Sequence, residues 1–225
     1  MLNQAVGSLL PAAAAVALSP IPIIAVVVVL STPRARTTGP AFALGWIAGL
    51  TAVSAVMVLL AGGADDPHRV GSTGVNWLQV AIGIVFLVMA AKQWRKRPKD
   101  GAPPDEPKWM STIDSLRPAR AFVLGVALSG ANPKNLALTL AAAASIAQAD
   151  LGQKDTVTAV AVFVALGSLT VAGSVLFYLV APGRAVGPLA GLKKFMTDNS
   201  AVIMMVVLLL IGAKLLGDGL AGVWD

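Results

Sequence analysis

Six long apolar segments, separated by polar turns, dominate this sequence and restrict what it can fold into. They cover roughly residues 5–30, 40–62, 75–94, 119–147, 156–181 and 200–221. A helix needs about 20 apolar residues to cross the hydrocarbon core of a bilayer. The chain is 56% hydrophobic and 12% charged, whereas soluble domains carry about 25% charged residues. The sequence therefore predicts an all-α integral membrane protein with six transmembrane helices.

One polar segment is much longer than the others and divides the six apolar segments into two groups of three. The predicted organisation is a three-helix repeat at 1–95, a basic, Pro-rich linker at 96–118 and a second three-helix repeat at 119–225. Short motifs recur in the same order in both halves: ALSPIP and ALSGANP, ALGW and ALGS, FLVMAAK and LLLIGAK. Because each half has an odd number of spans, the second repeat is expected to run inverted relative to the first.

The basic residues are distributed unevenly between the two sides of the predicted membrane protein. Two turns, those after the second and fourth spans, carry only Arg69 and Lys154. The positive-inside rule places the more basic side in the cytoplasm. We therefore expect a multi-pass protein of the plasma membrane, with both termini outside and the 92–120 loop cytoplasmic. The turns on the basic side carry Arg34, Arg36, Lys92, Arg95, Lys96, Arg97, Lys99, Lys108, Arg117, Arg120, Arg184, Lys193 and Lys194.

Prolines interrupt the first and fourth apolar segments at corresponding places in the two halves. The first interruption is LSPIPI at 18–23, and the second is SGANPKN at 129–135. Proline removes a backbone donor and crowds the preceding helical turn, so a helix kinks or breaks there. In hydrocarbon, the carbonyls that lose their partners must be satisfied by protein or by cavity water. Broken helices at matching repeat positions are typical of transporters, whose binding sites lie where the breaks meet.

The polar side chains at these two breaks form the predicted substrate site. Lys134 is the only charged residue well inside a predicted span, and a lysine there favours a carboxylate, phosphate or sulfate group on the ligand. Two alternatives remain open: the kinks serve packing alone, with each serine bonded back into its own helix, or Lys134 reaches an interface. The candidate substrate-binding residues are Ser19, Pro20, Pro22, Ser129, Asn132, Pro133, Lys134 and Asn135.

Several chemistries are disfavoured by what the sequence lacks. There is no cysteine and only one histidine, His68, which follows Asp65 and Asp66 in a predicted loop. No carboxylate lies deep in a predicted span, no Walker motif occurs, and no nucleophile–base pair is visible. We expect no enzyme activity, no cofactor, no metal and no nucleic-acid partner. For other polar or small residues in the spans, helix packing is the expected role: Gly45, Gly49, Thr51, Gly167, Ser168, Thr170, Gly173 and Ser174.

These features together resemble a known transporter family. The SPIPI break, the NPK break and six spans in two halves are similar to the LysE superfamily of small exporters. The stretch SPIPIIAVVVVLSTPRARTTGPAFALGWIAGL, from residue 19, resembles its GAP/Sap branch of actinobacteria more closely. That resemblance extends over nearly the full chain. It implies movement of glycopeptidolipids or sulfolipids to the cell surface.

The leading hypothesis is an exporter that moves an amphipathic, anionic lipid toward the cell surface by alternating access. One alternative is export of a small soluble metabolite or amino acid. Another is a scaffold without transport activity that serves lipid-synthesis or lipid-export machinery through the 92–120 loop, although a solvated linker is the favoured interpretation of this loop. Membrane lipids are expected partners, and small-residue helix faces leave a homodimer open.

Overall fold

The computed structural model describes residues 2–62, 77–95, 116–149 and 151–220, and these residues form helices without a strand. The predicted linker at 96–118 and the His68 loop fall almost wholly outside the described residues. The helices are α1 (Leu2–Ala17), α2 (Pro20–Leu30), α3 (Ala35–Gly62), α4 (Trp77–Arg95), α5 (Pro118–Gly130), α6 (Pro133–Gln148), α7 (Gln153–Gly167), α8 (Leu169–Val180) and α9 (Pro182–Leu220).

The helices correspond to the six predicted apolar segments, with two corrections. The fifth segment, expected to be continuous over 156–181, is divided into α7 and α8 by a 58° bend, which is larger than the 50° bend between α1 and α2. The polar residues before 200, expected to form a turn, are instead helical, because α9 begins at Pro182 and accommodates Pro188 within its first turns. Pro182 fits at the helix start because the first amide groups there need no helical partner. Pro188 lies inside the helix and removes one of its backbone donors.

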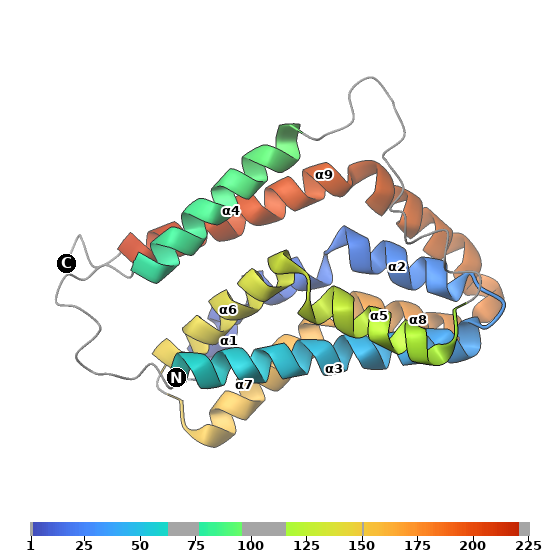
Figure 1. Ribbon diagram of the computed structural model, residues 1–225, viewed down its shortest axis with the longest axis horizontal. Helices are drawn as coiled ribbons and strands as arrows, with labels where there is room; N and C mark the ends of the chain where they lie inside the picture. Colours follow the sequence, from blue (N-terminus) through green and yellow to red (C-terminus); the bar gives the residue numbers. More distant parts are fainter. Residues whose placement is uncertain (1, 63–76, 96–115, 150, 221–225) are drawn as a thin grey trace.

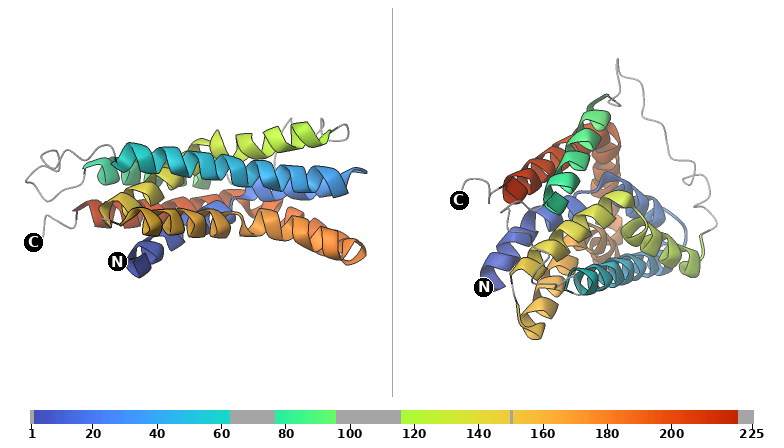
Figure 2. Two further views of the ribbon diagram at one scale, coloured as in Figure 1. Left: turned by 90° about the horizontal axis from the view of Figure 1, so that it is seen from below. Right: turned by 60° about the vertical axis from the view of Figure 1, so that its left-hand side comes forward.

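The helices lie roughly along one axis, and the ends of the bundle differ (Figures 1 and 2). At the right of Figure 1 lie the end of α2, the starts of α3 and α5, and the connection between α8 and α9. The first turn of α1 and the last turn of α9 lie toward the left. Helix α4 runs beside the second half of α9, and α3 packs along α5 and α6.

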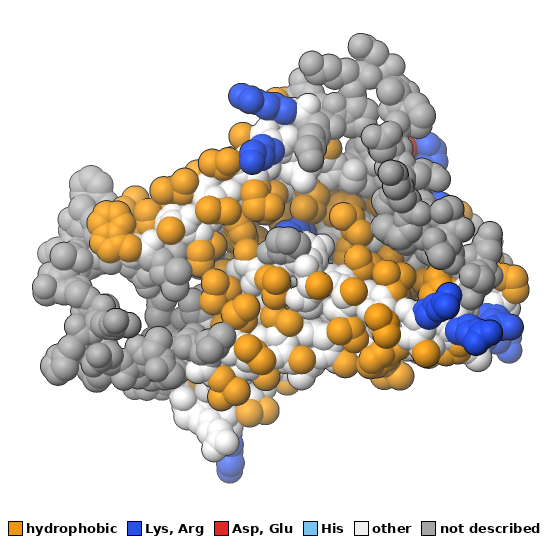
Figure 3. Space-filling view, in the orientation of Figure 1, with side chains coloured by type: hydrophobic (Ala, Val, Ile, Leu, Met, Phe, Trp, Pro, Cys, Tyr) orange, Lys and Arg blue, Asp and Glu red, His pale blue; other side chains and the backbone are white. Residues whose placement is uncertain are grey.

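Membrane-spanning character is clear for part of the described chain. Two helices, α3 and α9, are long and apolar enough to cross a bilayer, and the number rises to four if each bent pair, α1–α2 and α7–α8, is one span. Apolar side chains cover much of the face seen in Figure 3, and basic side chains lie mainly near its edges. This is the surface of a membrane protein, since a soluble protein keeps charge over most of its surface.

Glycines allow α3 and α5 to approach until their backbones touch. Gly45 and Gly49 form a GxxxG pair on α3 and face Phe122 and Ser129 of α5. Gly125 of α5 faces the Phe42 carbonyl oxygen on α3 in return. Because lipid tails are as apolar as the side chains, helices in a bilayer associate through such close packing rather than through the hydrophobic effect. The glycines therefore hold the broken fourth segment firmly against α3.

Replacing Gly125 with alanine is expected to destabilise the bundle. The new Cβ would clash with the Phe42 carbonyl oxygen, a backbone atom that cannot swing away. Overpacking of this kind costs about 1–3 kcal/mol, which thermal unfolding in detergent would detect as a lower Tm. Gly173→Ala is the matched control, because nothing lies within 4 Å of its added Cβ. Equal Tm values for the two variants would contradict the close α3–α5 contact.

Candidate functional site

The first break separates α1 from α2 at Leu18 and Ser19. Pro20 occupies the first position of α2, and Ser19 before it has extended backbone angles (φ −70°, ψ 117°), as a residue preceding proline prefers. The Ser19 hydroxyl does not cap α2. Instead it turns back and donates to the Ala15 carbonyl oxygen at 3.1 Å. Pro20 and Pro22 are buried, so the break lies inside the protein and its freed backbone groups need internal partners.

The second break, between α5 and α6, is a helix start rather than a defect in one continuous helix. The Asn132 side chain accepts a hydrogen bond from the Lys134 backbone N–H at 3.0 Å, and the Asn132 carbonyl accepts the first helical bond of α6 from Leu136. Asparagine as the N-cap, followed by proline at the first helical position, is a favoured way to begin a helix. The tetrapeptide NPKN therefore starts α6 and leaves Lys134 and Asn135 in its first turn.

The two breaks meet through the side chain of Lys134. Its Nζ donates to the Ser19 Oγ at 2.7 Å and to the Ala15 carbonyl oxygen at 3.0 Å. Asn135 lies beside them, with its Oδ1 3.5 Å from the Ser19 Oγ and its Nδ2 donating to the Leu128 carbonyl oxygen at 3.0 Å. The side chains from α6 thus satisfy carbonyls at the C-terminal ends of both α1 and α5. We call Ala15, Ser19, Lys134 and Asn135 the junction.

The junction is an unusual electrostatic environment because its amine is buried among neutral oxygens. Lys134 is 4% exposed, and its Nζ contacts a hydroxyl and a carbonyl, not a carboxylate. The ion pairs within the described residues lie elsewhere, between Lys194 and Asp198 and between Lys214 and Asp218. The C-terminal end of α1 carries partial negative charge and stabilises a cation there. It does not supply the full counter-ion that a buried charge requires.

A third break contributes a residue whose role the sequence did not reveal. Thr170, in the first turn of α8, donates to the Ala17 carbonyl oxygen at 2.6 Å. Ser168, at the bend between α7 and α8, is buried, and its hydroxyl has no hydrogen-bond partner among the described residues. Sequence analysis assigned both residues to packing, and GSLT in a continuous apolar run gave little sign of a bend. The α7–α8 break is therefore bonded to the end of α1 through Thr170.

The predicted residues do not all belong to the junction. Ser129 is fully buried but bonds back to Gly125 and Val126 of its own helix and faces Gly49. This matches the alternative in which a serine serves packing. Asn132 acts as the cap, and the Pro133 side chain lies outside the described features. Moreover, Ser19, Lys134 and Asn135 bond to one another rather than standing apart around an open cavity.

Metal binding finds no support in the part of the chain that the structure describes. No group of three or more His, Asp, Glu or Cys side chains there is placed to hold an ion. The polar groups of the junction are an amine, a hydroxyl and an amide, and an amine in its ammonium form cannot be a metal ligand. What this donor set can do is bind an anion, because the amine and the Asn135 amide both donate hydrogen bonds.

Comparison with known proteins identifies one family. The model of the family described as Sap, sulfolipid-1-addressing protein, matches residues 9–221. This range contains the junction and the described helices from the second half of α1 to the end of α9. Searches of the curated proteins and of the solved structures returned no match.

Thr170→Val is expected to loosen the contact between α8 and α1. Valine has nearly the shape of threonine but leaves the Ala17 carbonyl without this donor. The loss should cost about 1 kcal/mol, the size of one interhelical hydrogen bond in a membrane protein, measurable as a lower Tm in detergent. Thr158→Val is the matched control, because Thr158 is exposed and bonds only within its own helix. A Thr170 variant as stable as this control would show that the contact does not join the two breaks.

Proposed function

The chain belongs to the Sap family, and from that premise we propose that it carries an amphipathic, anionic lipid across the plasma membrane toward the cell surface. The family description names a sulfolipid, which is a lipid with an anionic head group. The apolar helices support the membrane location. The end of the bundle at the right of Figure 1 holds the turn before α3 and the starts of α3, α5 and α9, with Arg34, Arg36, Arg117, Arg120 and Arg184, and we call it the basic end. We propose that it faces the cytoplasm. Both termini would then lie outside, in keeping with the common end of the bundle toward which α1 begins and α9 ends (Figure 1).

The observation that carries this proposal is the buried amine of Lys134 at the meeting point of two broken helices. Among the described residues it has no carboxylate partner, and burying an uncompensated charge is costly. A protein that keeps such a group inside its membrane domain gains a place where an anion is favoured. In our proposal, the sulfate or phosphate of the lipid head group replaces Ser19 and the Ala15 carbonyl as the partner of Lys134.

Alternating access between two inverted repeats is the mechanism we propose. In this arrangement the first repeat contains α1 to α4 and the second contains α5 to α9. The equivalent elements would be α1 and α5, α2 and α6, α3 and the α7–α8 pair, and α4 and α9. The helix contacts support this equivalence. The contact of α1 with α7 corresponds to that of α5 with α3, and the contact of α2 with α8 corresponds to that of α6 with α3. Helices α4 and α9 pack on each other through Gly83 and Gly212. Rocking one repeat against the other would open the junction alternately to each side.

The apolar lining of a groove on the bundle favours an amphipathic substrate over a small soluble one. A groove of about 460 Å³ between α3 and α7 has mainly aliphatic walls and includes Thr51 and the unpartnered Ser168 hydroxyl. A path for an amino acid or a polar metabolite would need polar groups along its length. An apolar groove and a polar junction in the same bundle instead suit a molecule with an acyl chain and a polar head. Soluble-metabolite export therefore remains the second candidate.

The third candidate is a scaffold for lipid-synthesis or lipid-export machinery that transports nothing itself. Its proposed docking segment, 92–120, lies largely outside the described residues. Each of these proposals describes a protein without enzyme activity.

Lys134→Met tests the transport proposal. Methionine retains much of the apolar stem of lysine, and Ser19 still donates to Ala15, so the bundle should fold. In liposomes, we expect movement of a fluorescent anionic lipid between leaflets to slow about tenfold or more, the loss of a hydrogen bond to a charged group. Lys134→Arg, which keeps the cation, should retain part of the activity. A neutral phosphatidylcholine probe should move little in any of these proteins.

Lys154→Met is the matched control, since Lys154 is an exposed lysine in the first turn of α7. It should transport like the unmodified chain. A folded Lys134→Met protein with undiminished transport would remove Lys134 from the substrate site. An unmodified chain that moves no lipid under any ion gradient would contradict autonomous transport and favour the scaffold.

A further inference from the structure

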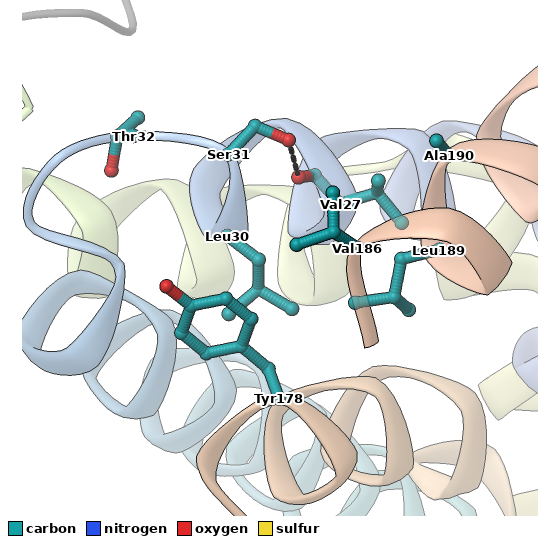
Figure 4. A pocket seen from close by; sticks show the side chains of 8 residues that line it. All are labelled: Val27, Leu30, Ser31, Thr32, Tyr178, Val186, Leu189 and Ala190. Atoms are coloured by element: carbon teal, nitrogen blue, oxygen red, sulfur yellow. Dashed lines mark hydrogen bonds between the residues drawn. The ribbon is translucent and has the colours of Figure 1, made fainter. Parts of the chain in front are cut away.

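A second, separate cavity lies at the basic end of the bundle (Figure 4). Its volume is about 260 Å³, slightly below the roughly 300 Å³ at which pockets for whole small molecules begin. Three helices build it: the last turn of α2, the end of α8 and the first turns of α9. The lining residues are Val27, Leu30, Ser31, Thr32, Tyr178, Val186, Leu189 and Ala190.

The lining separates into an apolar part and a group of three hydroxyls. Five of the eight lining side chains are aliphatic. Two of the hydroxyls are already engaged, because Ser31 donates to the Val27 carbonyl and Thr32 to the Val29 carbonyl, each at 2.8 Å. The Tyr178 hydroxyl is different: it has no hydrogen-bond partner among the described residues. It is directed toward the α2–α3 turn in Figure 4 and is available to donate to a ligand.

Two arginines lie close in the chain to residues that line this cavity. Arg34 follows Thr32 by two residues, and Arg184 precedes Val186 by two residues. Both arginines are exposed, and no described carboxylate is paired with either. Arg36 lies at the start of α3, at the same end of the bundle. Guanidinium groups bind phosphate and sulfate well because they offer several donors in a planar fork.

We propose that this cavity, which we call the α2–α8–α9 pocket, binds an anionic membrane lipid at the cytoplasmic surface. The Tyr178 hydroxyl and the neighbouring arginines hold the phosphate or sulfate of the head group, and the aliphatic wall holds the first carbons of the acyl chain. The volume admits part of a lipid and leaves the rest in the bilayer. A nucleotide fits poorly, since its sugar and phosphates gain nothing from the aliphatic wall.

The position of the pocket connects it to the junction. Helix α2 begins directly after the break at Ser19, and α8 begins directly after the bend at Ser168. A lipid bound between the far ends of α2 and α8 therefore contacts two half-helices that both start beside the end of α1. Helix α2 follows α1 across the break at Ser19, and α8 is bonded to the Ala17 carbonyl of α1 through Thr170. Binding there biases the relative positions of the two half-helices. The inference requires the proposed membrane placement, but it does not require that the chain transports lipid.

Photocrosslinking tests the pocket without any transport measurement. The full chain is placed in nanodiscs of phosphatidylcholine that contain a photoactivatable phosphatidylglycerol, and adducts are mapped by mass spectrometry to α2, α8 and α9. Ala190→Phe fills the pocket from an exposed position of α9. Tyr178→Phe removes only the free hydroxyl. We expect each variant to lower adduct yield in the pocket about tenfold, as for a lost hydrogen bond to a charged group.

Ala213→Phe is the matched control, an exposed alanine near the other end of α9, and its adduct yield should not change. An equal yield from photoactivatable phosphatidylcholine, or an Ala190→Phe yield like that of the control, would overturn the proposal. Protection by inorganic sulfate as strong as protection by unlabelled phosphatidylglycerol would also overturn it, since the aliphatic wall would then contribute nothing. Loss of transport in Lys134→Met with normal adducts here would leave this pocket intact as a separate site.

Discussion

The arrangement of the helices depends on how the carbonyls at the end of α1 are satisfied. A helix that stops inside a membrane protein leaves its last carbonyls without partners, and leaving them bare in an apolar interior is costly. Here the Ala15 carbonyl oxygen accepts hydrogen bonds from the amine of Lys134 and the hydroxyl of Ser19. The Ala17 carbonyl oxygen accepts one from the hydroxyl of Thr170. These donors come from α6, from the break itself and from α8. One helix end thus joins its own break to two others, each of which lies more than a hundred residues further along the chain.

The sequence predicted the helical, membrane-protein character of the chain better than it predicted where the helices break and which groups they contact. Long apolar segments and two proline breaks predicted a helical membrane protein, and the described residues confirm helices and a break at Ser19. The family match confirms the Sap branch of the resemblance, whereas LysE membership, six spans and inverted repeats remain predictions. The break at Ser168 was missed, because glycine and serine in an apolar run are also common in continuous transmembrane helices.

The sequence predicted only part of the candidate site. Lysine, asparagine and proline together in an apolar segment drew attention to Lys134 and Asn135, and both lie buried at the junction. The partners of Lys134 include a backbone carbonyl of alanine, which no residue pattern can mark. Ser129 bonds back to the carbonyl four residues earlier, as Ser19 does, but it faces Gly49 of α3 and has no hydrogen bond to Lys134 among the described residues. Corresponding serines of the two predicted repeats therefore share the bond within their own helix but not the contact with Lys134.

The central claim is that Lys134 and Ser19 hold the two breaks together, and a double-mutant cycle tests it most directly. Ser19→Ala, Lys134→Met and the double variant would be compared by their free energies of unfolding in a reversible detergent titration. Because the Lys134 amine lies 2.7 Å from the Ser19 hydroxyl, we expect a coupling energy of about 1–2 kcal/mol, as for residues in one hydrogen-bond network. Additivity of the two single changes to within about 0.3 kcal/mol would contradict the claim.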